Sequence, residues 1–226
     1  MRAWLASADD ILRQARWTTL ESGTGRAIAR LLACLIVFGL LYGAAMGCFR
    51  GFIGETQWLR QITYSAIKVP LLFSVTFAIS LPSFFVLNSL FGLRNDFERA
   101  VRALVATQAG LAIILVSLAP ITLLWYASSD VYRHALLFNG LMFALASLSA
   151  QWLLHGYYGP LIAANRRHRW LLWTWGIVYV LVAVQMAWLL RPFIGAPGVE
   201  VTFIREEAWD NAYVVVARLL WRTLGF

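Results

Sequence analysis

The sequence predicts an all-α fold: a polytopic membrane helix bundle of about five transmembrane helices, with interfacial amphipathic helices toward its N- and C-terminal ends. Composition is the first reason, because 61% of the 226 residues are hydrophobic and only 13% are charged, about half the charged fraction of a soluble domain. The second reason is the presence of five long apolar runs. The third is the abundance of Trp (11) and Tyr (8), which concentrate where hydrocarbon meets lipid headgroups.

The apolar runs define the predicted spans. A helix needs about 20 apolar residues to cross the roughly 30 Å hydrocarbon core, and five stretches approach or exceed that length: residues 31–49, 69–93, 103–129, 135–158 and 170–190. The second and third are longer than required, so tilt or kinking is expected. The chain therefore divides into a cytoplasmic amphipathic segment (1–30), a five-helix transmembrane domain (31–190), and an extended connector followed by a C-terminal amphipathic helix (191–226).

Three shorter stretches are amphipathic rather than spanning. Ser7-Ala8-Asp9-Asp10 resembles a capping box that opens a helix, with Gly23 as its stop. In the first loop and in the tail, apolar residues recur at helical spacing: Trp58, Leu59, Ile62 and Ala66, then Trp209, Tyr213, Val216 and Leu220. We expect these helices to lie in the membrane interface, or one of them to dock on a partner subunit. Residues 199–204 alternate in a strand-like pattern.

The distribution of basic residues predicts orientation. The N-terminal tail and the second and fourth loops hold eleven Lys and Arg residues, and the opposite side holds eight. The densest cluster, Arg166-Arg167-His168-Arg169, falls in a short loop, where the positive-inside rule is most reliable. We therefore predict a multi-pass protein of the bacterial inner membrane with a cytoplasmic N-terminus and an outer C-terminus.

Glycines recur every four residues in the first span, at Gly39, Gly43, Gly47 and Gly51. This spacing lines one helix face with small residues, so that another helix backbone can approach closely. We expect packing within the chain, against the second or fourth span. A homodimer or a partner's helix on the same face is the alternative.

Prolines mark expected kinks at Pro70 and Pro82 in or beside the second span and at Pro120 in the third. Broken helices are typical of transporters, although ordinary kinked spans are commoner. No Asp, Glu, Lys or Arg falls in the middle of a span, so the sequence predicts no buried charge and argues against ion coupling. Amides inside the spans are expected to bond between helices: Gln108, Asn139, Gln151 and Gln185.

Catalytic, metal and cofactor motifs are not evident. The three histidines are far apart in the sequence, and neither HExxH nor CxxC occurs, so we predict neither a metal site nor an enzyme. His155, near the end of the fourth span, is the one weak candidate for binding a cofactor, as an axial ligand to a haem or chlorin. A second axial ligand at matching depth is not evident, and the cofactor is therefore left unknown.

The charge pattern also bears on partners. The net charge is +8, but the cations are spread among the gaps between apolar runs rather than gathered into a footprint for nucleic acid. Their distribution fits attraction to anionic lipids. We expect membrane lipids as partners, together with another membrane protein or a second copy of the chain, and no nucleic acid.

The five-span plan and glycine-rich first span, with Tyr42-Gly43, Met46-Gly47 and Lys68-Val69-Pro70, resemble the Yip-type membrane proteins, in particular their bacterial branch. The likeness covers residues 26–190 and rests on short motifs. It implies a non-enzymatic role, because eukaryotic members act as Rab-associated scaffolds in vesicle traffic. The outer connector and C-terminal helix depart from the family pattern, and no functional residue is carried over from it.

These observations favour a non-enzymatic protein that acts as a scaffold or accessory subunit of a larger membrane complex, which could carry pigments or redox cofactors. The alternative is a small-solute or lipid transporter built around the second span. An intramembrane enzyme ranks third. A polar cavity at mid-membrane with Pro82 in its wall would favour transport, whereas solid packing with apolar outer faces would favour a subunit.

Overall fold

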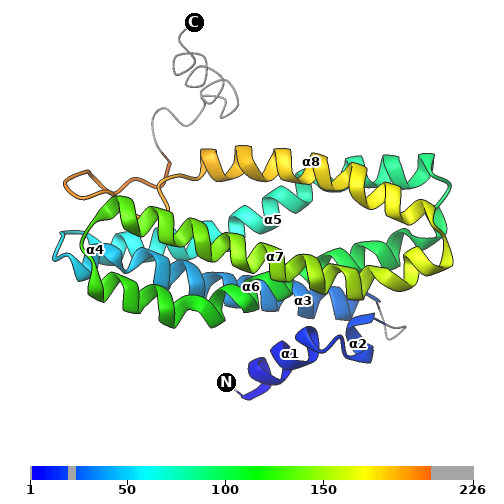
Figure 1. The fold of residues 1–226 in the computed structure, drawn as a ribbon, viewed down its shortest axis with the longest axis horizontal. Coiled ribbons are helices and arrows are strands. Elements are labelled where there is room, and N and C mark those ends of the chain that lie inside the picture. The colour runs from blue at the N-terminus through cyan, green and yellow to red at the C-terminus, as the bar shows by residue number, and fades with distance from the viewer. Residues whose placement is uncertain (1, 20–23, 205–226) are drawn as a thin grey trace, which may run out of the picture.

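The computed structural model describes residues 2–19 and 24–204, and these form a helix bundle (Figure 1). In chain order, its elements are α1 (Arg2–Leu12), α2 (Arg16–Thr19), α3 (Thr24–Gly47), α4 (Phe49–Phe52), α5 (Trp58–Leu90), the 3-10 turn η1 (Arg94–Asp96), α6 (Phe97–Ser128), α7 (Tyr132–Ala164) and α8 (Arg167–Leu189). The predicted C-terminal amphipathic helix lies outside the described residues.

Five of these helices are long and apolar enough to cross a membrane, which confirms the predicted number of spans. They are longer than the apolar runs, because each helix begins before its run in a more polar stretch, and α7 also continues past its run to Ala164. The separate interfacial helix predicted for the first loop is wrong: Trp58 begins α5, which runs without a break through Pro70 to Leu90. Pro70 removes one backbone hydrogen bond and its ring crowds the carbonyl of Ala66, four positions earlier, yet α5 continues through it.

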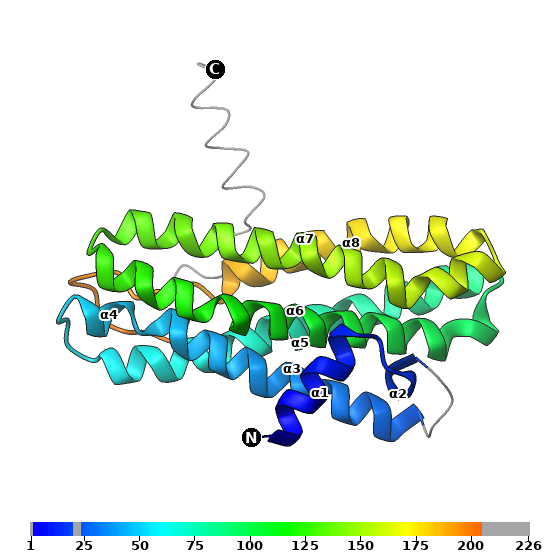
Figure 2. The same ribbon diagram turned by 60° about the horizontal axis from the view of Figure 1, so that its bottom comes forward.

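α3 and α6 form the centre of the bundle. α3 packs against both α5 and α6, while α7 covers α6 and α8 covers α5 (Figures 1 and 2). α7 and α8 touch each other only sparsely, although they are consecutive in the chain. The bundle is therefore a curved row of helices in the order α7, α6, α3, α5, α8.

The glycine face of α3 is occupied by α5. A Cβ atom on Gly43 would overlap with the Ser65 carbonyl and lie 2.8 Å from Ala66 Cα. One on Gly47 would lie 2.7 Å from Ile62 Cα. Because these neighbours are backbone atoms, α5 could not approach α3 this closely if either position carried a side chain. The sequence predicted that this glycine face packs within the chain against the second or fourth span, and the structure confirms packing against the second span, α5.

The N-terminal segment folds back along the bundle. α1 lies against the side of α6 and α3 (Figure 2), with Ala8 and Ile11 buried. The predicted capping box is wrong, because Ser7 lies in the middle of α1 and its hydroxyl donates to Ala3 O at 2.9 Å. The helix ends at Leu12, and Gln14 follows in the left-handed backbone region with φ 56°.

The loops alternate between the two ends of the bundle. We name the end with α2 and the loops at 91–96 and 165–166 the N-side, and the end with the loops at 53–57, 129–131 and 190–204 the C-side (Figure 1). Contacts within each end support this grouping: Arg167 donates to Phe91 O at the N-side, and Tyr132 donates to Ile194 O at the C-side.

Candidate functional site

The connector after α8 is held to the C-side by a buried arginine. Arg50 Nη1 donates to Ala196 O (3.1 Å) and to Val199 O (2.8 Å). Its other terminal nitrogen, Nη2, lies 3.1 Å from Glu55 Oε2, and the second oxygen of Glu55 accepts from Gly198 N. Since a side chain takes the Val199 carbonyl and no strand lies beside this segment in the described part of the chain, the predicted strand-like structure at 199–204 is wrong.

Three residues of α5 hold the preceding part of the connector. Gln61 Nε2 donates to Phe193 O at 3.0 Å, and Ser65 Oγ donates to the same carbonyl. One turn further, Lys68 Nζ donates to Pro192 O at 2.6 Å. We refer to Arg50, Glu55, Gln61, Ser65 and Lys68, with connector residues 192–199, as the C-side cap.

The C-side cap contains two buried cations, so the prediction of no buried charge is wrong. Arg50 is 3% exposed and Lys68 is fully buried. The 33 residues of α5 extend about 50 Å, and Lys68 lies ten residues, or about 15 Å, from its C-side end. This position is only just inside a 30 Å hydrocarbon core centred on the helix. Connector carbonyls without helical partners supply the acceptors that the lysine needs.

A second polar cluster joins three helices inside the bundle. Asn139 Nδ2 on α7 donates to Tyr126 Oη on α6 at 2.6 Å and to Ala135 O at 2.8 Å. Tyr42 of α3 lies 3.5 Å from Asn139 Oδ1, and Tyr126 Oη donates to Met46 O. The prediction that intramembrane amides bond between helices is confirmed for Asn139 by this contact.

At the N-side, two tyrosines of α7 connect this helix to other elements through their hydroxyl groups. Tyr157 Oη on α7 donates to Ile11 O at 2.6 Å and lies 3.1 Å from Thr18 Oγ1, so it fixes the turn between α1 and α2. Nearby in the sequence, Tyr158 Oη lies 3.3 Å from His168 Nδ1, and His168 Nε2 lies 3.2 Å from Asp96 Oδ2. This second row connects α7, α8 and η1, and His168 is fully buried within it.

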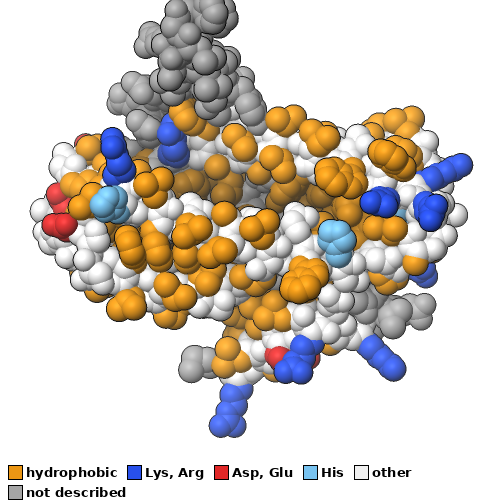
Figure 3. All heavy atoms as spheres, viewed as in Figure 1, with side chains coloured by type: hydrophobic (Ala, Val, Ile, Leu, Met, Phe, Trp, Pro, Cys, Tyr) orange, Lys and Arg blue, Asp and Glu red, His pale blue; other side chains and the backbone are white. Residues whose placement is uncertain are grey.

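α8 is attached mainly to α5 and leaves a hollow toward α7. Figure 3 shows this hollow between the two helices, lined by apolar side chains. Trp175 fixes α8 on α5, because its Nε1 donates to Ser80 O at 3.0 Å. Gln108 Nε2 of α6 reaches across to Tyr179 Oη at 2.9 Å, which confirms an interhelical role for this amide too.

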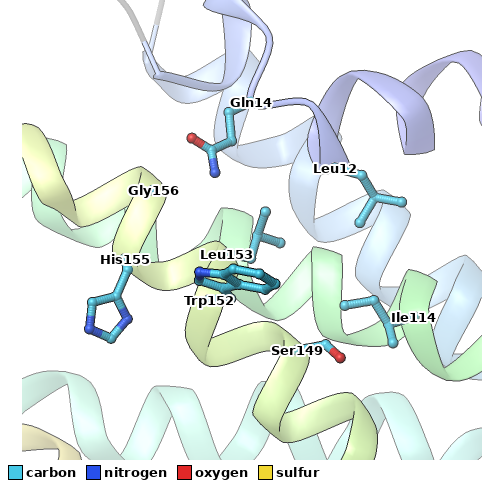
Figure 4. Close-up of a pocket in the computed structure, with 8 residues that line it drawn as sticks. All are labelled: Leu12, Gln14, Ile114, Ser149, Trp152, Leu153, His155 and Gly156. Atoms are coloured by element: carbon cyan, nitrogen blue, oxygen red, sulfur yellow. The ribbon is translucent and has the colours of Figure 1, made fainter.

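His155 lies at the surface and lines a different hollow, between α7 and the end of α1 (Figure 4). Its Nδ1 lies 2.7 Å from Gln151 O. Within residues 2–19 and 24–204, His, Cys, Asp and Glu side chains form no group of three that could hold a metal ion. Neither observation tests the predicted role of His155 in binding a cofactor, which stays a prediction.

The predicted kink residues all lie inside continuous helices. Pro70 packs on the α3 glycine face, since a Cβ on Gly39 would lie 3.1 Å from Pro70 Cβ. Pro82 and Pro120 are exposed on the outside of α5 and α6. Gly51, the last residue of the predicted glycine row, is also exposed, beside the Trp58 ring.

No family model, curated protein or solved structure matches this chain. The resemblance to the Yip-type proteins therefore stays a prediction.

Sequence reasoning missed the buried role of Arg50, Gln61 and Lys68, and the role of Tyr157. The available signal was the connector itself: an irregular, Pro- and Gly-containing segment beside a membrane needs donors for its carbonyls, and cations in the facing loop can provide them.

Proposed function

We propose that the chain is a non-enzymatic scaffold or accessory subunit of a larger membrane complex, and that α8 presents its outer face to a transmembrane helix of the partner. We also propose the bacterial inner membrane as its location, with the N-side facing the cytoplasm. The observation that carries the proposal is the contrast between a core tied together at both ends and one peripheral helix, α8, whose outer face is left uncovered by the described residues.

The ties at the two ends support a static role. The C-side cap fastens the connector after α8 to α4 and α5, and Tyr157 fastens α1 to α7. Alternating access requires one group of helices to rock against another, and these hydrogen bonds oppose any rocking that separates the connector from α4 and α5 or α1 from α7. Pro82 also lies on the exposed outside of α5, not in the wall of a cavity as the transporter hypothesis required.

The outer face of α8 supports a helical partner. Its exposed large apolar residues all follow an alternating spacing of three and four positions except Leu181: Trp170, Trp173, Ile177, Val180, Leu181 and Val184. That spacing places a continuous apolar seam along a helix and is the pattern used for knobs-into-holes packing against another helix.

The test is purification of the tagged protein from native membranes in mild detergent, followed by mass spectrometry and an absorbance spectrum. We expect a membrane protein in stoichiometric amount, and the spectrum tells whether the complex carries a pigment. Val180→Trp should reduce recovery of the partner at least fivefold. Ile36→Trp, a matched change on the exposed side of α3, should leave it unchanged. Recovery of a lone, colourless monomer would contradict the proposal.

A further inference from the structure

The hollow beside His155 has the size of a ligand site. It has a volume of about 610 Å³ and is lined by residues of the N-terminal segment, α6 and α7: Leu12, Gln14, Ile114, Ser149, Trp152, Leu153, His155 and Gly156 (Figure 4). Pockets that bind small molecules have volumes of roughly 300–1,000 Å³. The proposed scaffold role makes no use of this hollow.

Polar groups lie at one end of the hollow. Gln14 lies in the left-handed region (φ 56°), and its amide occupies the space of a Cβ on residue 156, so a side chain at that position would displace the amide. His155 Nδ1 faces Gln151 O at 2.7 Å, which leaves Nε2 for an outside partner. The Gln14 amide and His155 Nε2 therefore make no hydrogen bond within the described part of the chain, and both can bind a ligand.

Apolar side chains form the rest of the wall. Leu12, Ile114 and Leu153 line it, and the Trp152 ring, which is 85% exposed, stands at its edge. The hydroxyl of Ser149 already donates to Leu145 O at 2.9 Å, so this residue adds little polarity. The hollow therefore has a polar end near Gln14 and His155 and an apolar remainder.

The position along α7 matches one leaflet of a bilayer. The 33 residues of α7 extend about 50 Å, so about 10 Å projects beyond each face of a 30 Å hydrocarbon core centred on the helix. Gly156 lies eight residues, about 12 Å, from the N-side end at Ala164. The polar end of the hollow is thus at the headgroup boundary, and Ser149, seven residues deeper, is inside the hydrocarbon.

We propose that this hollow binds a glycerophospholipid of the N-side leaflet. Its headgroup and glycerol region contact the Gln14 amide and His155 Nε2, and one acyl chain lies along Trp152, Leu153 and Ile114. The neighbouring Arg13 is exposed, but its Nε is paired with Asp9 Oδ1 at 2.7 Å, so the headgroup contacts are assigned to Gln14 and His155 alone. The hollow is open to the bilayer, so the lipid enters by lateral diffusion.

The experiment uses the full-length protein in nanodiscs that contain phosphatidylethanolamine with a photoactivatable group in one acyl chain. After illumination, mass spectrometry locates the crosslinks. We expect them to concentrate on residues 149–156, and Gly156→Ala to reduce them at least threefold, because the new methyl group displaces the Gln14 amide. Gly159→Ala is the matched control, since a Cβ there meets no atom within 4 Å.

Crosslinks spread equally over the exposed faces of α3 and α5 would show a general lipid shell and overturn the proposal. So would unchanged labelling in Gly156→Ala. If that variant melts at a lower temperature than the wild type, Gln14→Leu removes the amide without crowding α7 and should give the same threefold loss. Displacement of the phospholipid by a tenfold lower concentration of an isoprenoid quinone would assign the hollow to another amphiphile. None of these outcomes depends on whether a partner protein binds α8.

Discussion

α3 and α8 are both apolar enough to span a membrane, yet the chain uses them in opposite ways. In the most apolar 18-residue stretch of each helix, 56% of α3 residues are buried and only 11% of α8 residues are buried. α3 meets its neighbours through glycines that bring backbones together, whereas α8 meets α5 through a few large side chains such as Trp175. The mean hydropathy is 2.2 for the span that contains α3 and 1.6 for α8, and both values are high enough for a membrane span. The spacing of small residues distinguishes them.

The largest effect should come from filling the α3 glycine face. In Gly43→Leu, the new side chain must displace the backbone of α5 at Ser65 and Ala66. Because backbone atoms cannot move aside as a flexible side chain can, we expect the free energy of unfolding to fall by about 3 kcal/mol or more. The fraction folded during titration with SDS, followed by tryptophan fluorescence, measures the loss. Gly140→Leu on α7 is the control, because a Cβ there meets no atom within 4 Å. Equal stability of the two variants would contradict the close α3–α5 contact.

The second largest effect should come from removing the Lys68 ammonium group, which anchors the connector after α8. Lys68→Met keeps the apolar stem but leaves the Pro192 carbonyl without its donor, and an unsatisfied buried polar group costs about 1–3 kcal/mol. We expect a lower melting temperature and faster proteolysis within residues 191–204. Arg60→Met serves as control, since the Arg60 side chain is exposed and bonds only locally, to Tyr64. If the variant melts at the wild-type temperature and its connector resists proteolysis equally, Arg50 and Gln61 are enough to hold the connector without Lys68.

The contrast between α3 and α8 also separates what the sequence could predict from what it could not. The five spans and the α3 glycine face follow from local patterns, namely run length and four-residue spacing. The burial of Lys68 does not, because it depends on a connector that is 124 residues away in the chain and returns to the same end of the bundle.

The capping box predicted in the N-terminal segment is wrong for a similar reason. Ser7 has the side chain of a helix cap, but its hydroxyl instead donates within α1 and accepts from Arg30 Nη2 at 2.7 Å. Ser7 therefore makes a tertiary contact with α3 from the middle of α1 and does not cap a helix end. The hollow near Gln14 depends on the same packing, since it needs α1 beside α7. No periodicity in either segment alone could reveal it.

The smallest effect should come from the polar contact between the core and α8. In Gln108→Leu, the hydrogen bond from α6 to Tyr179 Oη is lost, and interhelical hydrogen bonds in membranes contribute about 0.6 kcal/mol on average. A shift of that size is measurable in the SDS titration, and Tyr179→Phe should reproduce it because it removes the acceptor. The double variant should then be no less stable than either single variant, since both remove one bond. A loss as large as that of Gly43→Leu would mean that α8 is bound into the core, and it would remove the physical basis for treating α8 as a face presented to a partner.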